Sequence, residues 1–262
     1  MRTSTENDSF FNVPLTKHHV SIGEQDLPFR YYEGTQFIAM YFADKNVVTQ
    51  KLKGTGLEPV IIAGKAVAAI PIYEYIKSSA NYYKEAAIAY LVNPIGKKPI
   101  SSLLSLISPA NNRIVGLYIE HLPVTTELAN ACGRELWGFP KFVTQIDSEI
   151  KGSNLKSAVY DPNGKDTIFT LKGKVGVGMP IPAMNLILYS NLNNDIYRTN
   201  INMRYGTTAA FPGSMRINIG ESDHKMASDL RALNIDGKKP SMVLYADRFS
   251  SLLPMGVKQQ IQ

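Results

Sequence analysis

Apolar and polar positions divide the chain into short segments separated by turn residues. Aromatic side chains recur closely through residues 29–43 and predict a strand, and Asp44 after it is a good helix N-cap. Residues 59–75 are rich in valine, isoleucine and alanine with little alternation, which is typical of strands covered on both faces. Two strands around the turn Asp-Pro-Asn-Gly at 161–164 predict a hairpin over 155–175.

The remaining periodic segments predict more strands than helices. Further strands are expected at 82–92, 114–119, 141–150, 185–189, 196–205, 214–219 and 242–246. Short helices are expected after Asp44, at 123–132 with Gly133 as its end, and at 222–233 with Ser222 or Asp223 as its cap. No linker or repeat divides the chain, so we expect one mainly β (α+β) domain over residues 1–262, with residues 1–20 loosely ordered.

Composition narrows the class of protein. The 262 residues are 44% hydrophobic and 19% charged, as in ordinary globular proteins. The net charge of +6 is scattered, without a basic run that would track phosphates, so we expect no nucleic-acid partner. A single cysteine, Cys132, indicates neither disulfides nor a thiolate metal site, and no secretory signal or membrane span is visible. A cytoplasmic location is therefore expected.

Several common catalytic motifs are absent. The chain lacks Gly-x-Ser-x-Gly, His-Glu-x-x-His, Cys-x-x-Cys and Gly-x-Gly-x-x-Gly. His121 and His224 are expected to pack or to cap helices, because no partner is identifiable from sequence. We expect no metal and no cofactor.

The segment 133–141, Gly-Arg-Glu-Leu-Trp-Gly-Phe-Pro-Lys, carries the most distinctive chemistry. Lys141 follows Gly-Phe-Pro, the only tryptophan lies four positions before it, and Phe142 comes next. An enclosed ammonium is costly, and burial favours the neutral amine, which can attack a carbonyl carbon. Strand alternation places Lys141 on a face with Val143 and Gln145, which either meets water or lines the interior of a barrel.

Two other charged residues have alternative interpretations. Glu85 begins an apolar strand, and the sequence favours a solvated strand start over a carboxylate directed into a cavity. Arg134 is interpreted first as a partner of Glu127 or Glu135, with direct substrate contact as the alternative.

Segment 133–141, preceded by Thr-Glu-Leu-Ala at 126–129, closely resembles the lysine motif of the acetoacetate decarboxylase family. Weaker similarity covers 41–59, Tyr83-Lys84-Glu85 and the helix from His224. The resemblance implies a cone-like, closed antiparallel β-barrel with a few short peripheral helices, and a homo-oligomer. It also implies a Schiff-base lysine at Lys141 and an active-site glutamate at Glu85.

The function implied by the resemblance is decarboxylation of a β-keto acid such as acetoacetate, a small-molecule substrate, through a lysine imine. Lys141 and Glu85 are the expected catalytic residues, and the expected substrate-binding residues are Arg134, Trp137, Phe139 and Phe142. Decarboxylases of this family carry a second lysine where this chain has Phe142. Alternatives are therefore an aldolase or dehydratase acting on pyruvate-like keto acids through the same lysine, and a barrel that binds a keto acid without turnover.

Overall fold

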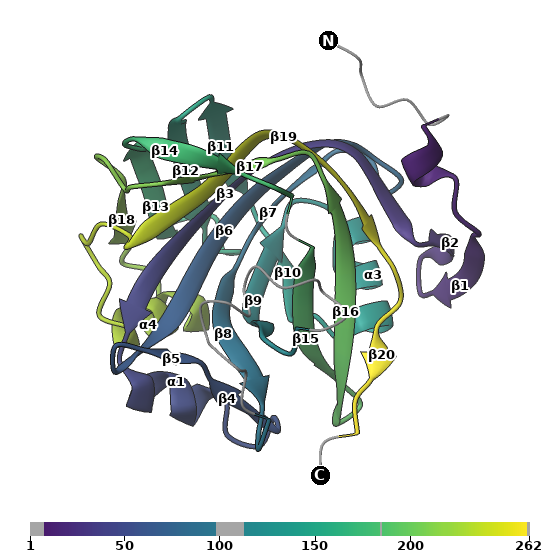
Figure 1. Ribbon diagram of the computed structural model, residues 1–262, viewed down its shortest axis with the longest axis horizontal. Coiled ribbons are helices and arrows are strands. Elements are labelled where there is room, and N and C mark those ends of the chain that lie inside the picture. The colour runs from purple at the N-terminus through teal and green to yellow at the C-terminus, as the bar shows by residue number, and fades with distance from the viewer. Residues whose placement is uncertain (1–7, 98–112, 184, 261–262) are drawn as a thin grey trace.

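Seven strands close into a barrel in the computed structural model, which describes residues 8–97, 113–183 and 185–260. The ring follows the order β3, β6, β8, β9, β15, β16, β19 and back to β3 (Figure 1). Neighbours run antiparallel except β9 and β15, which are parallel. The bounds are β3 Phe29–Ala43, β6 Lys65–Ser78, β8 Ile88–Pro94, β9 Gly116–Val124, β15 Leu186–Leu192, β16 Asp195–Arg204 and β19 Met242–Leu253. The predicted closed barrel is confirmed.

Shorter strands extend the barrel sheet. β7 (Tyr83–Ala86) pairs with β6 and β9, and β10 (Lys141–Val143) runs parallel to β9. The others are β4 Leu57–Pro59, β5 Ile61–Ile62, β14 Gly178–Ile181, β17 Thr207–Ala210 and β20 Val257–Lys258. A separate four-stranded sheet contains β11 Ile146–Lys151, β12 Asn154–Tyr160, β13 Thr167–Lys174 and β18 Arg216–Ile219. The predicted hairpin at 155–175 is the β12–β13 pair.

Both faces of β6 are buried from Ala66 to Tyr73, as the apolar run at 59–75 predicts. On β6, Ala68, Ile70 and Ile72 belong to a core cluster that includes side chains of the four-stranded sheet and of α4 (Lys225–Ala232). The alternate residues Tyr73 and Tyr75 belong to a different cluster, inside the barrel. Because successive side chains of a strand point to opposite faces, one strand serves an outer core and an inner one.

All three predicted short helices are present, and the positions of some of their ends and caps differ from the prediction. α1 (Lys45–Lys51) begins at Asp44, whose side chain accepts a hydrogen bond from the Asn46 N–H at 2.7 Å. α4 is capped by His224, whose Nδ1 accepts from the Met226 N–H, so the predicted cap at Ser222 or Asp223 is wrong. A 3₁₀ turn, η1 (Ser9–Phe11), precedes the first hairpin.

The predicted helix end at Gly133 is also wrong. α3 (Glu127–Trp137) runs through Gly133 and ends at Gly138, which adopts the left-handed conformation with φ of 66°. The strand predicted at 141–150 is two strands, β10 in the barrel sheet and β11 in the four-stranded sheet, with Thr144 and Gln145 between them. The chain changes sheets there.

The N-terminal segment is more regular than expected. Residues 1–7 lie outside the described residues, but β1 (Thr16–Val20) pairs with β2 (Gly23–Leu27), and Phe11 and Val20 are buried. Within the described parts of the chain, none of the helices is both long and apolar enough to cross a membrane.

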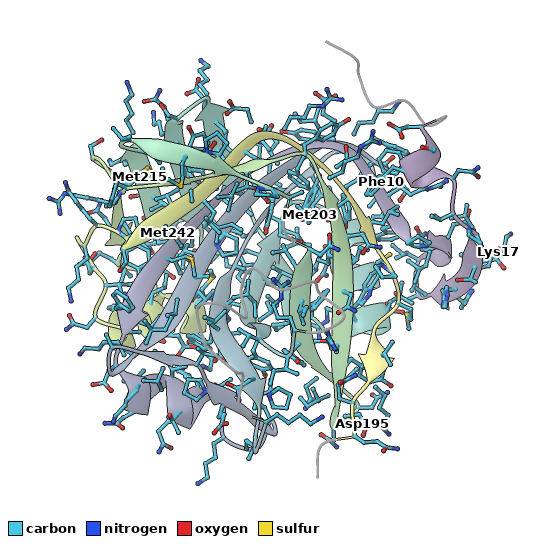
Figure 2. The ribbon with its side chains drawn as sticks, viewed as in Figure 1. Phe10, Lys17, Asp195, Met203, Met215 and Met242 are labelled. Atoms are coloured by element: carbon cyan, nitrogen blue, oxygen red, sulfur yellow. The ribbon has the colours of Figure 1, made fainter. Side chains whose placement is uncertain are left out.

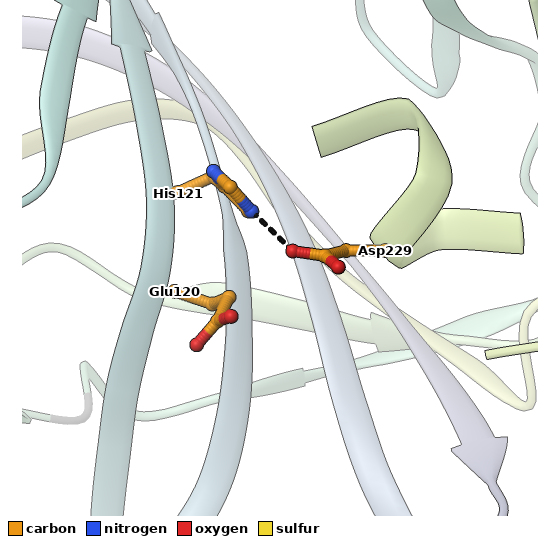
Figure 3. A group of neighbouring side chains, drawn as sticks. All are labelled: Glu120, His121 and Asp229. Carbon is orange, nitrogen blue, oxygen red and sulfur yellow. Dashed lines mark hydrogen bonds and ion pairs between the residues drawn. The ribbon is translucent and has the colours of Figure 1, made fainter. Parts of the chain in front are cut away.

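Asp229 of α4 joins two helices to the barrel wall. Its carboxylate meets His121 Nε2 of β9 at 2.7 Å, as Figure 3 shows, and it accepts from Lys225 Nζ at 2.6 Å and from Lys51 of α1. Burial alone would raise the pKa of Asp229, but the hydrogen bonds from His121, Lys225 and Lys51 lower it to about 2.

This carboxylate should therefore contribute to stability. We expect Asp229→Asn to lower the free energy of unfolding by about 2 kcal/mol in urea denaturation at pH 7, because Lys51, Lys225 and His121 lose a charged hydrogen-bond acceptor. Since the folded pKa lies below the ordinary value of 3.8, the contribution is present above about pH 4 and is lost as pH falls toward about 2. Exposed Asp223→Asn on the same segment is the control; equal effects of the two variants would contradict the assignment.

Candidate active site

Lys141 begins β10 and is only 6% exposed. Its Nζ donates to Glu85 Oε2 at 2.7 Å. The ring of Tyr83 lies beneath the ammonium, with its centroid 5.5 Å from Nζ. Of the two interpretations open from sequence, Lys141 therefore lines the barrel interior and does not face water.

Two glycines bring Lys141 to this position. At the end of α3 the N–H of left-handed Gly138 bonds the Arg134 carbonyl, which is the single hydrogen bond of an αL cap, and the Phe139 N–H bonds the Gly133 carbonyl. The chain thus turns back beside its own helix, where a Cβ on Gly133 would lie 2.3 Å from Lys141 Cδ. Gly138 permits the turn, and Gly133 leaves the passage for the lysine side chain.

Glu85 faces the same interior from β7. It is 7% exposed, lies opposite Tyr73 of β6 in the strand register, and its Oε1 accepts from the Tyr75 hydroxyl at 3.2 Å. The solvated strand start that the sequence favoured is therefore wrong. The closure of the barrel covers this strand start, which a single segment cannot show.

Buried tyrosines surround the pair. The hydroxyls of Tyr31 and Tyr83 are hydrogen-bonded at 2.9 Å, and the rings of Tyr31 and Tyr75 pack 4.3 Å apart. Burial, followed by the nearby Glu85 charge, raises the pKa of Tyr75 well above its ordinary value, and burial does the same for Tyr83. These phenols stay protonated near neutral pH and remain hydrogen-bond donors.

The pair opens into a mostly apolar cavity within the barrel, with about 650 Å³ between its lining atoms, part of it open to solvent. Met203 of β16, which is labelled in Figure 2, is one of the side chains that line this cavity. The lining is formed by Tyr31, Pro71, Tyr73, Tyr75, Glu85, Ala87, Leu117, Ile119, Leu122, Phe139, Lys141, Leu186, Leu188, Ile201, Met203, Phe249, Ser251 and Leu253. Among these described residues only Lys141 and Glu85 carry a charge.

Of the predicted substrate-binding residues, only Phe139 is among those that line this cavity. Arg134 is exposed, and its Nη1 donates to the Lys141 carbonyl at 3.1 Å. Trp137 is buried against Phe29 and donates to the Pro254 carbonyl. Phe142 points to the opposite face of β10 and packs on His224, because adjacent strand residues alternate.

The tyrosines and leucines of the cavity were not identified as site residues from sequence. Tyr31 lies in the aromatic run at 29–43, and Tyr73 and Tyr75 lie at the end of the apolar run at 59–75. Their aromatic character signals a strand, and only barrel closure brings them to one cavity.

A group of potential metal ligands lies elsewhere, at Glu120, His121 and Asp229, whose donor atoms are within 4.8 Å of one another (Figure 3). Lys51 and Lys225 already bond the Asp229 carboxylate, and Lys51 Nζ lies 3.9 Å from Glu120. Two ammonium groups thus supply the positive charge that these carboxylates require, so the group is explained as an ion network.

The buried pair makes a prediction about stability that does not depend on function. Glu85→Gln should lower the free energy of unfolding by about 3–5 kcal/mol, because Lys141 keeps a buried charge without its counter-ion. The double variant Glu85→Gln with Lys141→Met should recover at least half of that loss in urea denaturation. Additive losses from the two substitutions would show that the groups do not interact.

Comparison with known proteins places this geometry in a family. A model of the family described as acetoacetate decarboxylase matches residues 13–204. No curated protein matches the sequence. The structure of an acetoacetate decarboxylase from Legionella pneumophila superposes with a TM-score of 0.63 at 16% identity, covering 89% of this chain and 87% of that one.

Two further structures share the fold. One is an acetoacetate decarboxylase-like enzyme from Sphingomonas wittichii, with a TM-score of 0.62 at 12% identity and 90% and 94% coverage. The other is the enduracididine biosynthesis enzyme MppR, complexed with the condensation product of pyruvate and imidazole 4-carboxaldehyde, with a TM-score of 0.62 at 13% identity and 88% coverage of both chains. Because the family model spans most of the chain, including Glu85 and Lys141, the protein belongs to the acetoacetate decarboxylase family.

Proposed function

We propose that the protein decarboxylates a β-keto acid through an imine formed at Lys141. The observation that carries the proposal is the buried pair of Lys141 and Glu85, 2.7 Å apart at the wall of an apolar cavity. An amine in such a site has a proton acceptor within hydrogen-bond reach, and water is largely excluded from its surroundings.

The first step forms the imine. Glu85 takes a proton from the Lys141 ammonium, and the neutral amine attacks the ketone carbon of the substrate. Loss of water from the resulting carbinolamine leaves a protonated imine, with Glu85 available to return the proton that the departing hydroxyl needs. Tyr75, which donates to Glu85 Oε1, holds the carboxylate in place for both transfers.

The second step breaks the carbon–carbon bond. The electron pair of the bond to the carboxylate moves toward the imine nitrogen, so that carbon dioxide leaves and an enamine remains. Protonation of the enamine carbon regenerates an imine, and water releases the ketone and free Lys141. The net reaction consumes one proton and converts the β-keto acid to a ketone and carbon dioxide.

The polarity of the cavity favours loss of the carboxylate over its retention. Of the described lining residues, Lys141 is the only cation, and in the protonated imine its positive charge lies on the nitrogen that withdraws electrons from the reacting carbon. The substrate carboxylate would therefore lie among apolar side chains near the charge of Glu85. These surroundings destabilise the charged carboxylate relative to neutral carbon dioxide.

A second candidate is aldol or dehydration chemistry on a pyruvate-like keto acid. It uses the same imine, and the MppR structure with a pyruvate condensation product shares the fold. Phe142, in place of the second lysine expected of a decarboxylase, is a further reason to consider this candidate. An α-keto acid retains its carboxylate throughout, however, and the described lining offers that carboxylate no second cation.

The proposal is tested by trapping the imine. We expect acetoacetate with borohydride to leave a covalent adduct on Lys141, located by mass spectrometry, and acetoacetate alone to release carbon dioxide. Lys141→Met should abolish both. An adduct with pyruvate but no carbon dioxide from acetoacetate would favour the second candidate or a binding protein, and no adduct with any keto acid would overturn the enzyme proposals.

The passage beside α3 gives a further prediction. Gly133→Ala places a methyl carbon 2.3 Å from Lys141 Cδ, so the amine must move, and a displacement of about 1 Å costs roughly 100-fold in rate. We expect kcat/KM to fall by that order while circular dichroism stays like that of the wild type, since alanine suits a helix. Asn130→Ala on the same helix is the control and should keep full activity. A fully active Gly133→Ala variant would contradict the assigned position of Lys141.

A further inference from the structure

A second cavity adjoins the cavity at Lys141 inside the barrel. This second cavity, with about 520 Å³ between its lining atoms and part of it open to solvent, shares Leu117 and Leu186 with the first. On β6, Ala69 lines the second cavity and Pro71 lines the first; along the segment leading into β9, Val115 lines the second. Alternate residues of a strand share one face, so both cavities belong to the same barrel interior.

The second cavity is apolar. Its lining comprises Ile38, Met40, Ala69, Leu91, Arg113, Val115, Gly116, Leu117, Leu186, Ile187 and Leu244. The guanidinium of Arg113 donates to the backbone carbonyl of Asn185. The other described lining residues offer apolar side chains and backbone, which suits a hydrocarbon and provides little for a polar ligand.

A four-carbon keto acid cannot reach both cavities. With its ketone carbon at Lys141, acetoacetate presents one methyl group beyond the ketone, and the second cavity would contribute nothing to its binding. A longer chain would extend past Leu117 and Leu186, which line both cavities, and bury its methylenes in the second cavity. Burial of each methylene raises affinity by about three- to fourfold.

We propose that the substrate is a 3-oxo acid with an unbranched hydrocarbon chain, whose tail occupies the second cavity. The inference rests on the decarboxylation proposed above. The carboxylate and ketone react at Lys141 and Glu85, and the product is a methyl ketone of the same chain, one carbon shorter than the acid, together with carbon dioxide.

A chain-length series tests the proposal. The kcat/KM for carbon dioxide release from 3-oxobutanoate, 3-oxohexanoate, 3-oxooctanoate and 3-oxodecanoate should rise about tenfold for each added pair of carbons until the second cavity is filled. A flat or falling series, with 3-oxobutanoate still turned over, would overturn the chain-length inference and leave the decarboxylation intact.

A matched pair of variants locates the tail. Leu244 lines only the second cavity and is half-buried, whereas the next residue, Tyr245, points to the outer core and stacks on Phe37. Leu244→Trp should remove the gain for the eight- and ten-carbon acids and keep 3-oxobutanoate within twofold of the wild type. Tyr245→Trp should leave the whole series unchanged. A gain that survives Leu244→Trp would place the tail elsewhere and overturn the proposal.

A binding measurement separates failure of the tail site from failure of the chemistry. In the Lys141→Met background no imine can form, so calorimetry with 2-alkanones of three to nine carbons reports the cavity alone. Affinity that rises with chain length and is lost on adding Leu244→Trp supports the tail site even if no acid is decarboxylated. Affinity independent of chain length overturns it.

Discussion

The buried ion pair of Lys141 and Glu85 is the constraint on which the rest of the site depends. Either charge alone would be costly in a cavity walled by leucine, isoleucine and aromatic rings, and each makes the other tolerable. The pair requires two segments far apart in the chain to meet within 2.7 Å. The barrel brings β7 and β10 to the same strand, β9, and the turn at Gly138 directs the lysine inward past Gly133.

A barrel that keeps an interior cavity must gain its stability elsewhere. Here the outer face of the wall carries a large cluster that includes β6, the four-stranded sheet and α4. On that side Asp229 of α4 also forms hydrogen bonds with His121 of β9 and Lys51 of α1. Because strand residues alternate, the outer core can be packed densely without filling the inner layers. Stability and the reactive cavity thus use opposite faces of the same strands.

Strand alternation also decides where Phe142 points, at the position where the resemblance to acetoacetate decarboxylases implies a second lysine. Its side chain packs on His224 and on the outer core, on the far side of β10 from the cavity. Within the cavity the surroundings of Lys141 are instead the Glu85 carboxylate, the Tyr83 ring and apolar side chains. Lys141 is therefore a buried amine with one proton acceptor, Glu85, within hydrogen-bond distance.

The sequence by itself determined the strand-rich class, the start of α1 at Asp44, the hairpin at 155–175 and the nine-residue segment ending at Lys141. These depend on local spacing and on one contiguous motif. Only the tertiary structure decided that Lys141 and Glu85 face inward, that α3 continues through Gly133, and that the tyrosines of β3 and β6 share one cavity. Alternation identifies the two faces of a strand but cannot say which face is buried. In β6 both faces are buried. The closure of seven strands settles that choice, because it depends on pairings between segments distant in the chain.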